Sequence, residues 1–249
     1  MGLPMIFDRN QQLRSAMIGL PGLILLSACA VDPADRAYLA ALRGEEEGWS
    51  REKQIAHIDR AIELAPERSA YWQTRAIYRI DIRAYYRARA DLDQAILLLD
   101  RPYVRFLRGL VSCQFGRFRD ALPDFDAAIS GQPQNAQFYR GLALALASVG
   151  RAGEALADAE RLIALAPNLA ESIYVRGVAL SKLGRDEEAI GDFTEALRRR
   201  PEIIYPLRAR AASYQRKGDT TRAARDLADA AKREQHDMHC AACSDHFRY

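Results

Sequence analysis

Two stretches of this chain share one pattern and so decide its fold. Residues 183–201 read LGRDEEAIGDFTEALRRRP, and residues 149–167 read VGRAGEALADAERLIALAP, at an offset of 34 residues. Each begins with an apolar residue and Gly, continues with Ala five residues after the Gly, and closes on Pro. A pattern that recurs at a fixed interval of this length indicates a chain built from repeated structural units.

The same spacing extends in both directions and defines a frame of 34 residues. We number the positions of each copy from its first residue. A degraded copy over 35–68 is expected to cap the array, and five full copies follow within 69–237. These five copies are 69–101, which is one residue short, 102–135, 136–169, 170–203 and 204–237.

Small residues occupy fixed positions of the frame, and small residues let two helices approach closely. Position 20 is Ala in every full copy, at Ala88, Ala121, Ala155, Ala189 and Ala223. Position 8 is Ala or Gly throughout, whereas position 24 is mostly larger and apolar. Gly recurs at position 15, where it permits a tight turn, and Pro closes four copies, because Pro cannot continue a helix. The frame therefore predicts pairs of packed helices, each pair leaning on the next.

This pattern resembles the tetratricopeptide repeat over about 35–237. The resemblance implies an all-α fold, a right-handed superhelical solenoid of antiparallel helix pairs. It also implies a non-enzymatic scaffold for protein–protein interaction, in which the first helix of each copy lines a concave groove. The aromatic and Arg side chains expected in that groove favour a peptide or helix with acidic residues as the partner. The groove residues we expect from positions 2 and 5 are Tyr103, Phe106, Arg140, Tyr174, Tyr205 and Arg208.

Positions 6 and 9 of the frame bear on what the groove can bind. Position 9 is apolar in every full copy, and apolar residues at helical spacing serve either as core or as contact surface. Members of the family that hold a chaperone tail use Asn at positions 6 and 9. Here position 6 holds Thr74, Leu107, Gly141, Val175 and Ala209, which argues against that class of partner.

A charge pattern runs through the same frame. Asp occupies position 23 in all five full copies, and Arg occupies position 7 in four of them, with Leu142 as the exception. These residues either pair across the two helices of one copy or are a coincidence of surface charges. A pair that is exposed to solvent would contribute only about 0–1 kcal/mol.

The N-terminal residues have the pattern of a targeting segment. Residues 1–28 carry basic residues followed by an apolar run too short to span a membrane, as in a secretory signal peptide. The sequence LSAC at 26–29 resembles the lipobox of bacterial lipoproteins, which implies a diacylglycerol and acyl chain (palmitate) on Cys29 and a linker over 29–34. Ordinary cleavage beside Cys29 is the alternative and would leave a soluble periplasmic protein. We expect a lipid anchor in the outer membrane, facing the periplasm.

The C-terminal tail, 238–249, concentrates Cys and His residues. The weak metal-ligand candidates are Cys240, Cys243, His239 and His246, a set that suits zinc or copper. In an oxidising periplasm the two cysteines instead form a disulfide, or the tail is a plain terminal segment. We expect no bound cofactor apart from the lipid, and the tail supports an alternative function as a small metal-binding or thiol-redox envelope module mounted on the repeats.

The remaining features exclude several classes of function. A net charge of +3 gives no argument for nucleic acid, and no Gly-rich phosphate loop or nucleophile motif is present, so we expect neither an enzyme nor a small-molecule substrate. The partners expected are other proteins of the cell envelope. The classes of process considered are pilus assembly, outer-membrane assembly and adaptors of murein enzymes, and the fold itself does not choose among them.

Overall fold

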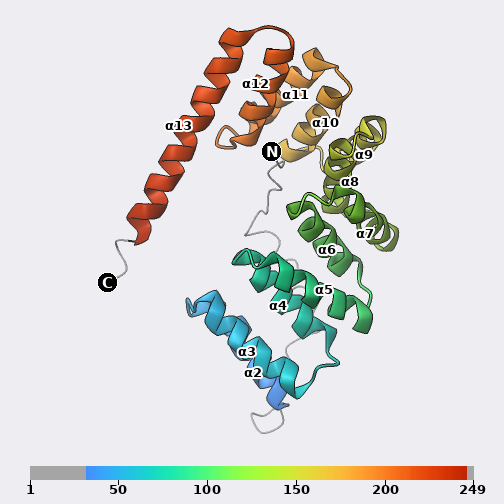
Figure 1. The fold of residues 1–249 in the computed structure, drawn as a ribbon, viewed down its shortest axis with the longest axis vertical. Coiled ribbons are helices and arrows are strands. Elements are labelled where there is room, and N and C mark those ends of the chain that lie inside the picture. Colours follow the sequence, from blue (N-terminus) through green and yellow to red (C-terminus); the bar gives the residue numbers. More distant parts are fainter. Residues whose placement is uncertain (1–31, 246–249) are drawn as a thin grey trace. The chain divides into compact units, whose positions relative to one another are not determined.

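The computed structural model describes the backbone of residues 32–245 and the side chains of residues 32–235. These residues form helices joined by short turns, without a strand among them (Figure 1). The expected all-α architecture is therefore confirmed. The chain divides into two compact units, Met1–Gly131 and Gln132–Tyr249, which are described separately.

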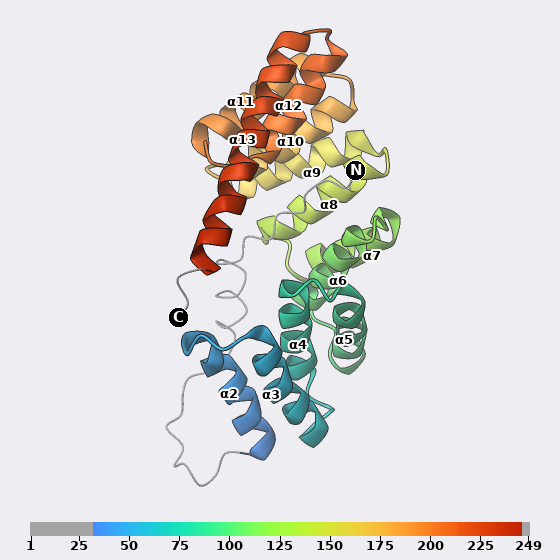
Figure 2. The same cartoon turned by 60° about the vertical axis from the view of Figure 1, so that its left-hand side comes forward.

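In the first unit, three antiparallel pairs follow one another along the sequence. The helices are α2 (Pro33–Glu46), α3 (Arg51–Leu64), α4 (Ser69–Asp81), α5 (Tyr85–Leu98), α6 (Pro102–Gln114) and α7 (Phe118–Gly131). Within each pair the two helices pack along their length, and α3 and α5 also contact the first helix of the next pair (Figure 2). Each pair thus buries apolar surface on its neighbour, as a repeat array requires.

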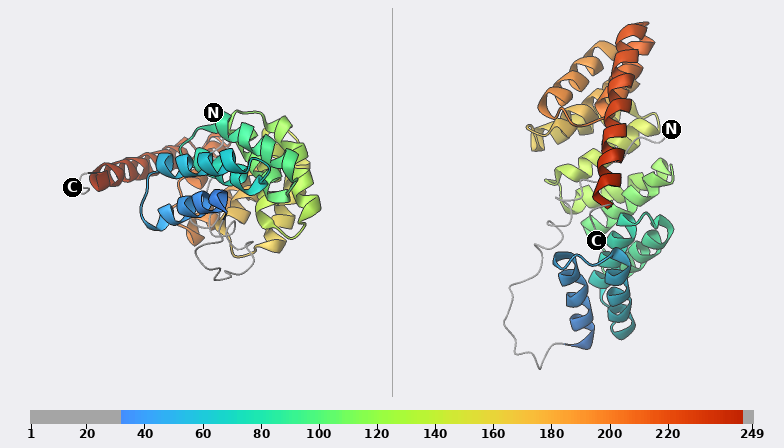
Figure 3. Two further views of the ribbon diagram at one scale, coloured as in Figure 1. Left: turned by 90° about the horizontal axis from the view of Figure 1, so that it is seen from below. Right: turned by 90° about the vertical axis from the view of Figure 1, so that its left-hand side faces the viewer.

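The second unit repeats this arrangement. Its helices are α8 (Ala136–Ser148), α9 (Ala152–Leu165), α10 (Ala170–Lys182), α11 (Asp186–Arg199), α12 (Tyr205–Arg216) and α13 (Thr220–Asp245). Helix α10 contacts both α8 and α12, so the first helices of the three copies are neighbours. Helix α13 is much longer than α12 and runs past its end (Figure 3).

The small residues of the frame lie where the two helices of a copy meet. Ala88, Ala121, Ala155 and Ala189 are completely buried, and Ala223 is nearly so. A Cβ added to Gly177 would lie 2.7 Å from the Cε1 atom of Phe193. In the two copies with Phe at position 24, the ring therefore packs directly on the backbone of the Gly at position 8, which leaves no room for a side chain there.

Position 15 of each copy adopts the left-handed backbone conformation that ends the first helix. Gly184 and Gly218 have φ values of +76° and +80°, and Gly116 and Gly150 are similar. The short copy 69–101 places Arg83 at this position, with φ of +60°. Because a Cβ is unfavourable in this conformation, Arg83 carries a local backbone strain that the other copies avoid.

Candidate peptide-binding surface

The two predicted groove residues of the first unit lie at different depths. Tyr103 is half-buried, and burial raises its pKa to about 12. Phe106 is only 1% exposed, and its ring centroid lies 5.9 Å from that of Phe125 on α7. Phe106 is thus an interior residue that joins the two helices of its copy. Our expectation that it contacts a partner is corrected: it supports the surface from below.

Tyr174 in the second unit needs the same correction. It is 3% exposed, and its ring lies 5.8 Å from Phe193 and 4.4 Å, edge to face, from Tyr205. Burial raises the pKa of Tyr174 above its ordinary value. Position 9 is also interior here, since Leu144 and Val178 are about as buried. Together these side chains form the floor beneath the first helices of this unit.

Arg140, Tyr205 and Arg208 remain closer to solvent in the second unit. Arg140 and Tyr205 are half-buried and Arg208 is exposed. The pKa of Tyr205 is raised by burial and by the charge of Glu171, whereas the guanidinium groups of Arg200 and Arg140 oppose the rise. Tyr205 on α12 therefore lies near Arg140 on α8, Glu171 on α10 and Arg200 in the turn after α11. They give the surface both cationic and aromatic character.

Arg208 already binds a carboxylate. Its Nη2 atom lies 2.7 Å from both oxygens of Glu234 on α13, and the two side chains are 54% and 41% exposed. Glu171, which holds position 2 of its copy as the predicted Tyr205 does in the next, forms an ion pair through one oxygen with Arg200. The surface thus consists of partly paired Arg and Glu side chains over a buried aromatic floor.

The comparisons with known proteins agree with this helical arrangement. A family model described as "Tetratricopeptide repeat" matches residues 106–170 and 149–203. Residues 106–203 carry tetratricopeptide repeats. No curated protein sequence matches the chain.

Solved structures with the same tetratricopeptide fold cover most of the chain. YrrB, described as a TPR protein with an unusual peptide-binding site, is 19% identical, with a TM-score of 0.61 over 71% of this chain and 91% of that one. A tetratricopeptide repeat protein from Parabacteroides merdae is 16% identical, with a TM-score of 0.66 over 80% of this chain and 78% of that one. MamA is 18% identical, with a TM-score of 0.61 over 68% and 93%. At such identities the likeness establishes the fold.

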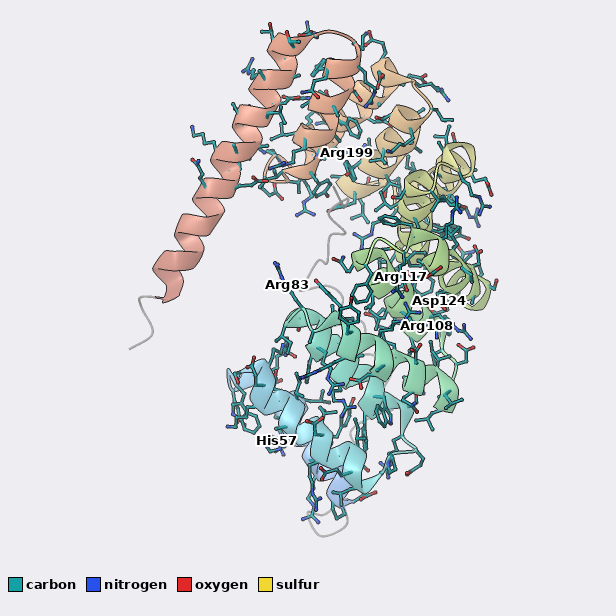
Figure 4. All side chains as sticks on the ribbon, in the orientation of Figure 1. His57, Arg83, Arg108, Arg117, Asp124 and Arg199 are labelled. Carbon is teal, nitrogen blue, oxygen red and sulfur yellow. The ribbon has the colours of Figure 1, made fainter. Side chains whose placement is uncertain are left out.

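The Arg and Asp residues of the tetratricopeptide frame do pair within single copies. In four copies the Arg at position 7 donates two hydrogen bonds to the Asp at position 23. Figure 4 labels one such pair, Arg108 and Asp124. The pairs are Arg75–Asp91, Arg108–Asp124, Arg176–Asp192 and Arg210–Asp226. The Asp side chains are 2% to 11% exposed, so these are not the exposed pairs of little value that a surface coincidence would give. Of the two alternatives left open by the sequence, the structure supports pairing within a copy.

Several of these arginines also reach the preceding tetratricopeptide copy. Arg75 Nη1 lies 2.6 Å from Asp59 Oδ1, and Arg108 Nη1 lies 2.8 Å from Asp93 Oδ1. In the second unit, Arg210 Nη1 donates to Thr194 Oγ1 at 2.9 Å. The acceptors occupy position 25 of the copy before, so one guanidinium connects three helices. This contact between copies had no counterpart in our expectations from the sequence.

The remaining candidates lie at the two ends of the chain. Cys29 is outside the described residues, as are the side chains of His239, Cys240, Cys243 and His246. Helix α13 continues through residue 245, so the backbone of the first part of the tail is helical. Among the described residues, no group of His, Cys, Asp and Glu has the arrangement of a metal site. Of the helices described, none combines the length and apolarity that crossing a membrane requires.

Proposed function

We propose that this protein is a non-enzymatic scaffold of the cell envelope, anchored by a lipid on Cys29 in the outer membrane and facing the periplasm. In this proposal its second unit binds acidic peptide or helix segments of envelope proteins. Such a scaffold serves pilus assembly, outer-membrane assembly or the recruitment of murein enzymes. The fold supports the general part of the proposal, because tetratricopeptide repeats mediate protein–protein interactions.

One observation carries the choice of surface and of partner charge. Arg208 on α12 holds the carboxylate of Glu234 in a forked arrangement at the solvent-facing edge of the surface. Arg guanidinium groups bind carboxylates in this way with high geometric specificity. A carboxylate of a partner is expected to take the place of Glu234. The unusual peptide-binding site ascribed to YrrB, which shares this fold, supports a peptide as the form of that partner.

The binding surface is tested by photocrosslinking in native envelopes. A photoreactive amino acid at position 234, beside Arg208, leaves Arg140 and Arg208 in place and should give discrete adducts with a partner protein. The matched control is position 198 on α11, where Arg198 is 72% exposed and ion-paired with Glu195 outside the proposed surface. Identical adducts from positions 234 and 198, or none from position 234, would contradict the proposed surface.

The role of Glu234 gives a second test. Glu234→Gln should strengthen binding of the crosslinked partner, because it frees Arg208 without removing it. Arg208→Glu should weaken the same interaction. Equal binding by both variants would show that Arg208 does not contact the partner.

The lipid anchor is tested by fractionation. Cys29→Ser should move the protein from the membrane fraction to the soluble periplasmic fraction, since two or more acyl chains are needed for stable anchoring. Cys113→Ser is the control, because Cys113 is a buried thiol inside α6. If the Cys29→Ser protein stays in the membrane fraction, the anchor lies elsewhere.

A further inference from the structure

Three side chains at the start of α8, α10 and α12 share an unusual property. Each has a buried polar atom without a hydrogen-bond partner: Gln137 Oε1, Glu171 Oε2 and Tyr205 Oη. All three occupy position 2 of their copy, so the atoms recur once per repeat along the second unit. Only two other side-chain atoms of the described residues share this property, Glu45 Oε2 and Tyr78 Oη in the first unit. We call the three atoms of the second unit the position-2 row.

Polar groups next to the row do have hydrogen-bond partners, so the lack of a partner is particular to the position-2 atoms. The Ser172 hydroxyl, one residue after Glu171, donates to the carbonyl oxygen of Ala166 at 2.9 Å. The hydroxyl of Tyr139 on α8 donates to the carbonyl oxygen of Pro133 at 3.2 Å. A buried polar atom without a hydrogen-bond partner destabilises the folded state, so three such atoms in register are unfavourable for the free protein. An incoming molecule that supplies the missing hydrogen bonds would recover this energy.

The chemistry of the row favours neutral donors. Gln137 Oε1 accepts hydrogen bonds, and the Tyr205 hydroxyl both donates and accepts. Glu171 carries a charge, but its other oxygen is paired with Arg200, and Arg140 adds further positive charge nearby. A Lys or Arg side chain of a partner would therefore meet repulsion, whereas a main-chain N–H is a neutral donor and meets none.

One peptide conformation has the period that we expect for the row. Packed helices lie about 8–10 Å apart, and we expect a similar interval between the position-2 residues of adjacent copies. A polyproline II segment has three residues per turn and rises about 3.1 Å per residue, so its equivalent N–H groups recur every 9 Å or so. We propose that the position-2 row binds the main-chain N–H groups of every third residue of an extended partner segment. This inference rests on the proposed function and names how its partner is held.

In this proposal the partner is recognised through contacts to its main chain and through contacts to its side chains. The row binds the main chain and fixes the direction and register of the segment, whatever its sequence. Arg140 and Arg208 select acidic side chains. Gln137 and Tyr205 are half-buried and Glu171 is 9% exposed, so the side chains reach the surface although the unpartnered atoms are covered. The outer torsions of Gln and Glu side chains are broad, and their rotation turns an oxygen toward an arriving donor.

The test uses the full chain and a dodecapeptide selected on it from a random displayed library. The peptide is then labelled with fluorescein, and its Kd is measured by fluorescence anisotropy. Three versions of the peptide carry N-methyl groups at every third residue, each in a different phase. One phase should weaken binding at least tenfold, and the other two should have smaller effects.

Variants of the protein separate binding from folding. Tyr205→Phe should raise the Kd about threefold to tenfold and leave the Tm of the free protein unchanged or higher, because it removes a polar atom that has no partner. Tyr139→Phe is the matched control: it removes a satisfied hydroxyl, so its Tm should fall while its Kd stays the same. Equal effects of all three N-methyl phases, or a lower Tm without a change in Kd for Tyr205→Phe, would overturn the inference while peptide binding stands. Failure to select any peptide would instead overturn the proposed function.

Discussion

The guanidinium of Arg108 and the carboxylate of Asp124 face each other across α6 and α7, with Nε–Oδ2 and Nη2–Oδ1 distances of 2.8 and 2.7 Å (Figure 4). Asp124 is 6% exposed, and Arg108 also binds Asp93, which is 47% exposed. The two aspartates therefore offer one arginine a buried and an exposed partner. We therefore expect the two ion pairs to contribute different amounts to the free energy of unfolding.

Removing the buried partner should destabilise the first unit strongly. Asp124→Asn is expected to lower the free energy of unfolding by about 2–4 kcal/mol, because it leaves the Arg108 charge half-buried without its main partner. Asp93→Asn, the matched control, should cost less than about 1 kcal/mol, since solvent screens that pair. Urea unfolding followed by circular dichroism measures both. Equal losses for the two variants would contradict the buried role of the pair.

Two glycines of the second unit should respond in opposite ways to the same substitution. Gly191→Ala on α11 should stabilise by about 0.5–1 kcal/mol, because nothing lies within 4 Å of the added Cβ and Ala favours the helix. Gly177→Ala on α10 should destabilise by about 1–2 kcal/mol, since its Cβ meets Phe193 and the helix preference only partly offsets the clash. Thermal unfolding of both variants checks the signs. A higher Tm for Gly177→Ala would mean that α10 and α11 move apart freely.

The strained turn of the short copy offers a stabilising substitution. Arg83 has φ of +60°, whereas its counterparts in the other full copies are glycines. Arg83→Gly should raise the free energy of unfolding by about 0.5–1 kcal/mol, because the strain removed exceeds the added entropy of the unfolded chain. Arg83→Ala serves as the control, since it keeps the Cβ and should give no such gain. An equal gain from Ala would point to the Arg side chain instead of the backbone.

Acid should weaken one ion pair of the second unit. Arg216 donates hydrogen bonds to Asp186 and lowers the pKa of that carboxyl below its ordinary value of 3.8, against the opposing effect of burial. A lowered folded-state pKa means that the pair stabilises the protein fully above pH 3.8 and loses this contribution as the pH falls below it. The stability gap between the wild type and Asp186→Asn should therefore narrow between about pH 6 and pH 3. Urea unfolding at both pH values measures the gap, and a constant gap would contradict the shift.

The sequence predicted the helix pairs well because their determinants are local and periodic. Ala189 and Gly184 each recur at a fixed position, and packing and turn geometry impose the same demand on every copy. The Arg–Asp pairing was also visible, since both partners hold constant positions. In these cases a residue type that recurs at a fixed position is enough to predict the contact.

Other features could not be read from the periodicity. Phe106 and Tyr174 occupy a position that lines a groove in related proteins, yet each turns inward because a large ring at position 24, Phe125 or Phe193, provides a packing partner. The contact of Arg108 with Asp93 was missed, because the acceptor at position 25 varies in type between copies. How deeply a side chain is buried, and which side chain of the next copy it contacts, depends on the particular neighbouring residues. The repeat pattern gives the residue type at each position but not these neighbours.

The arginine shared between adjacent copies has a further consequence. Apolar surfaces in contact tolerate sliding, because their attraction depends mainly on area. A planar fork bonded on one side to its own copy and on the other to the copy before tolerates little displacement. Such arginines therefore fix the register between adjacent copies. If one copy shifted or rotated relative to the next, the hydrogen bond between the copies would break even where the apolar contact remained.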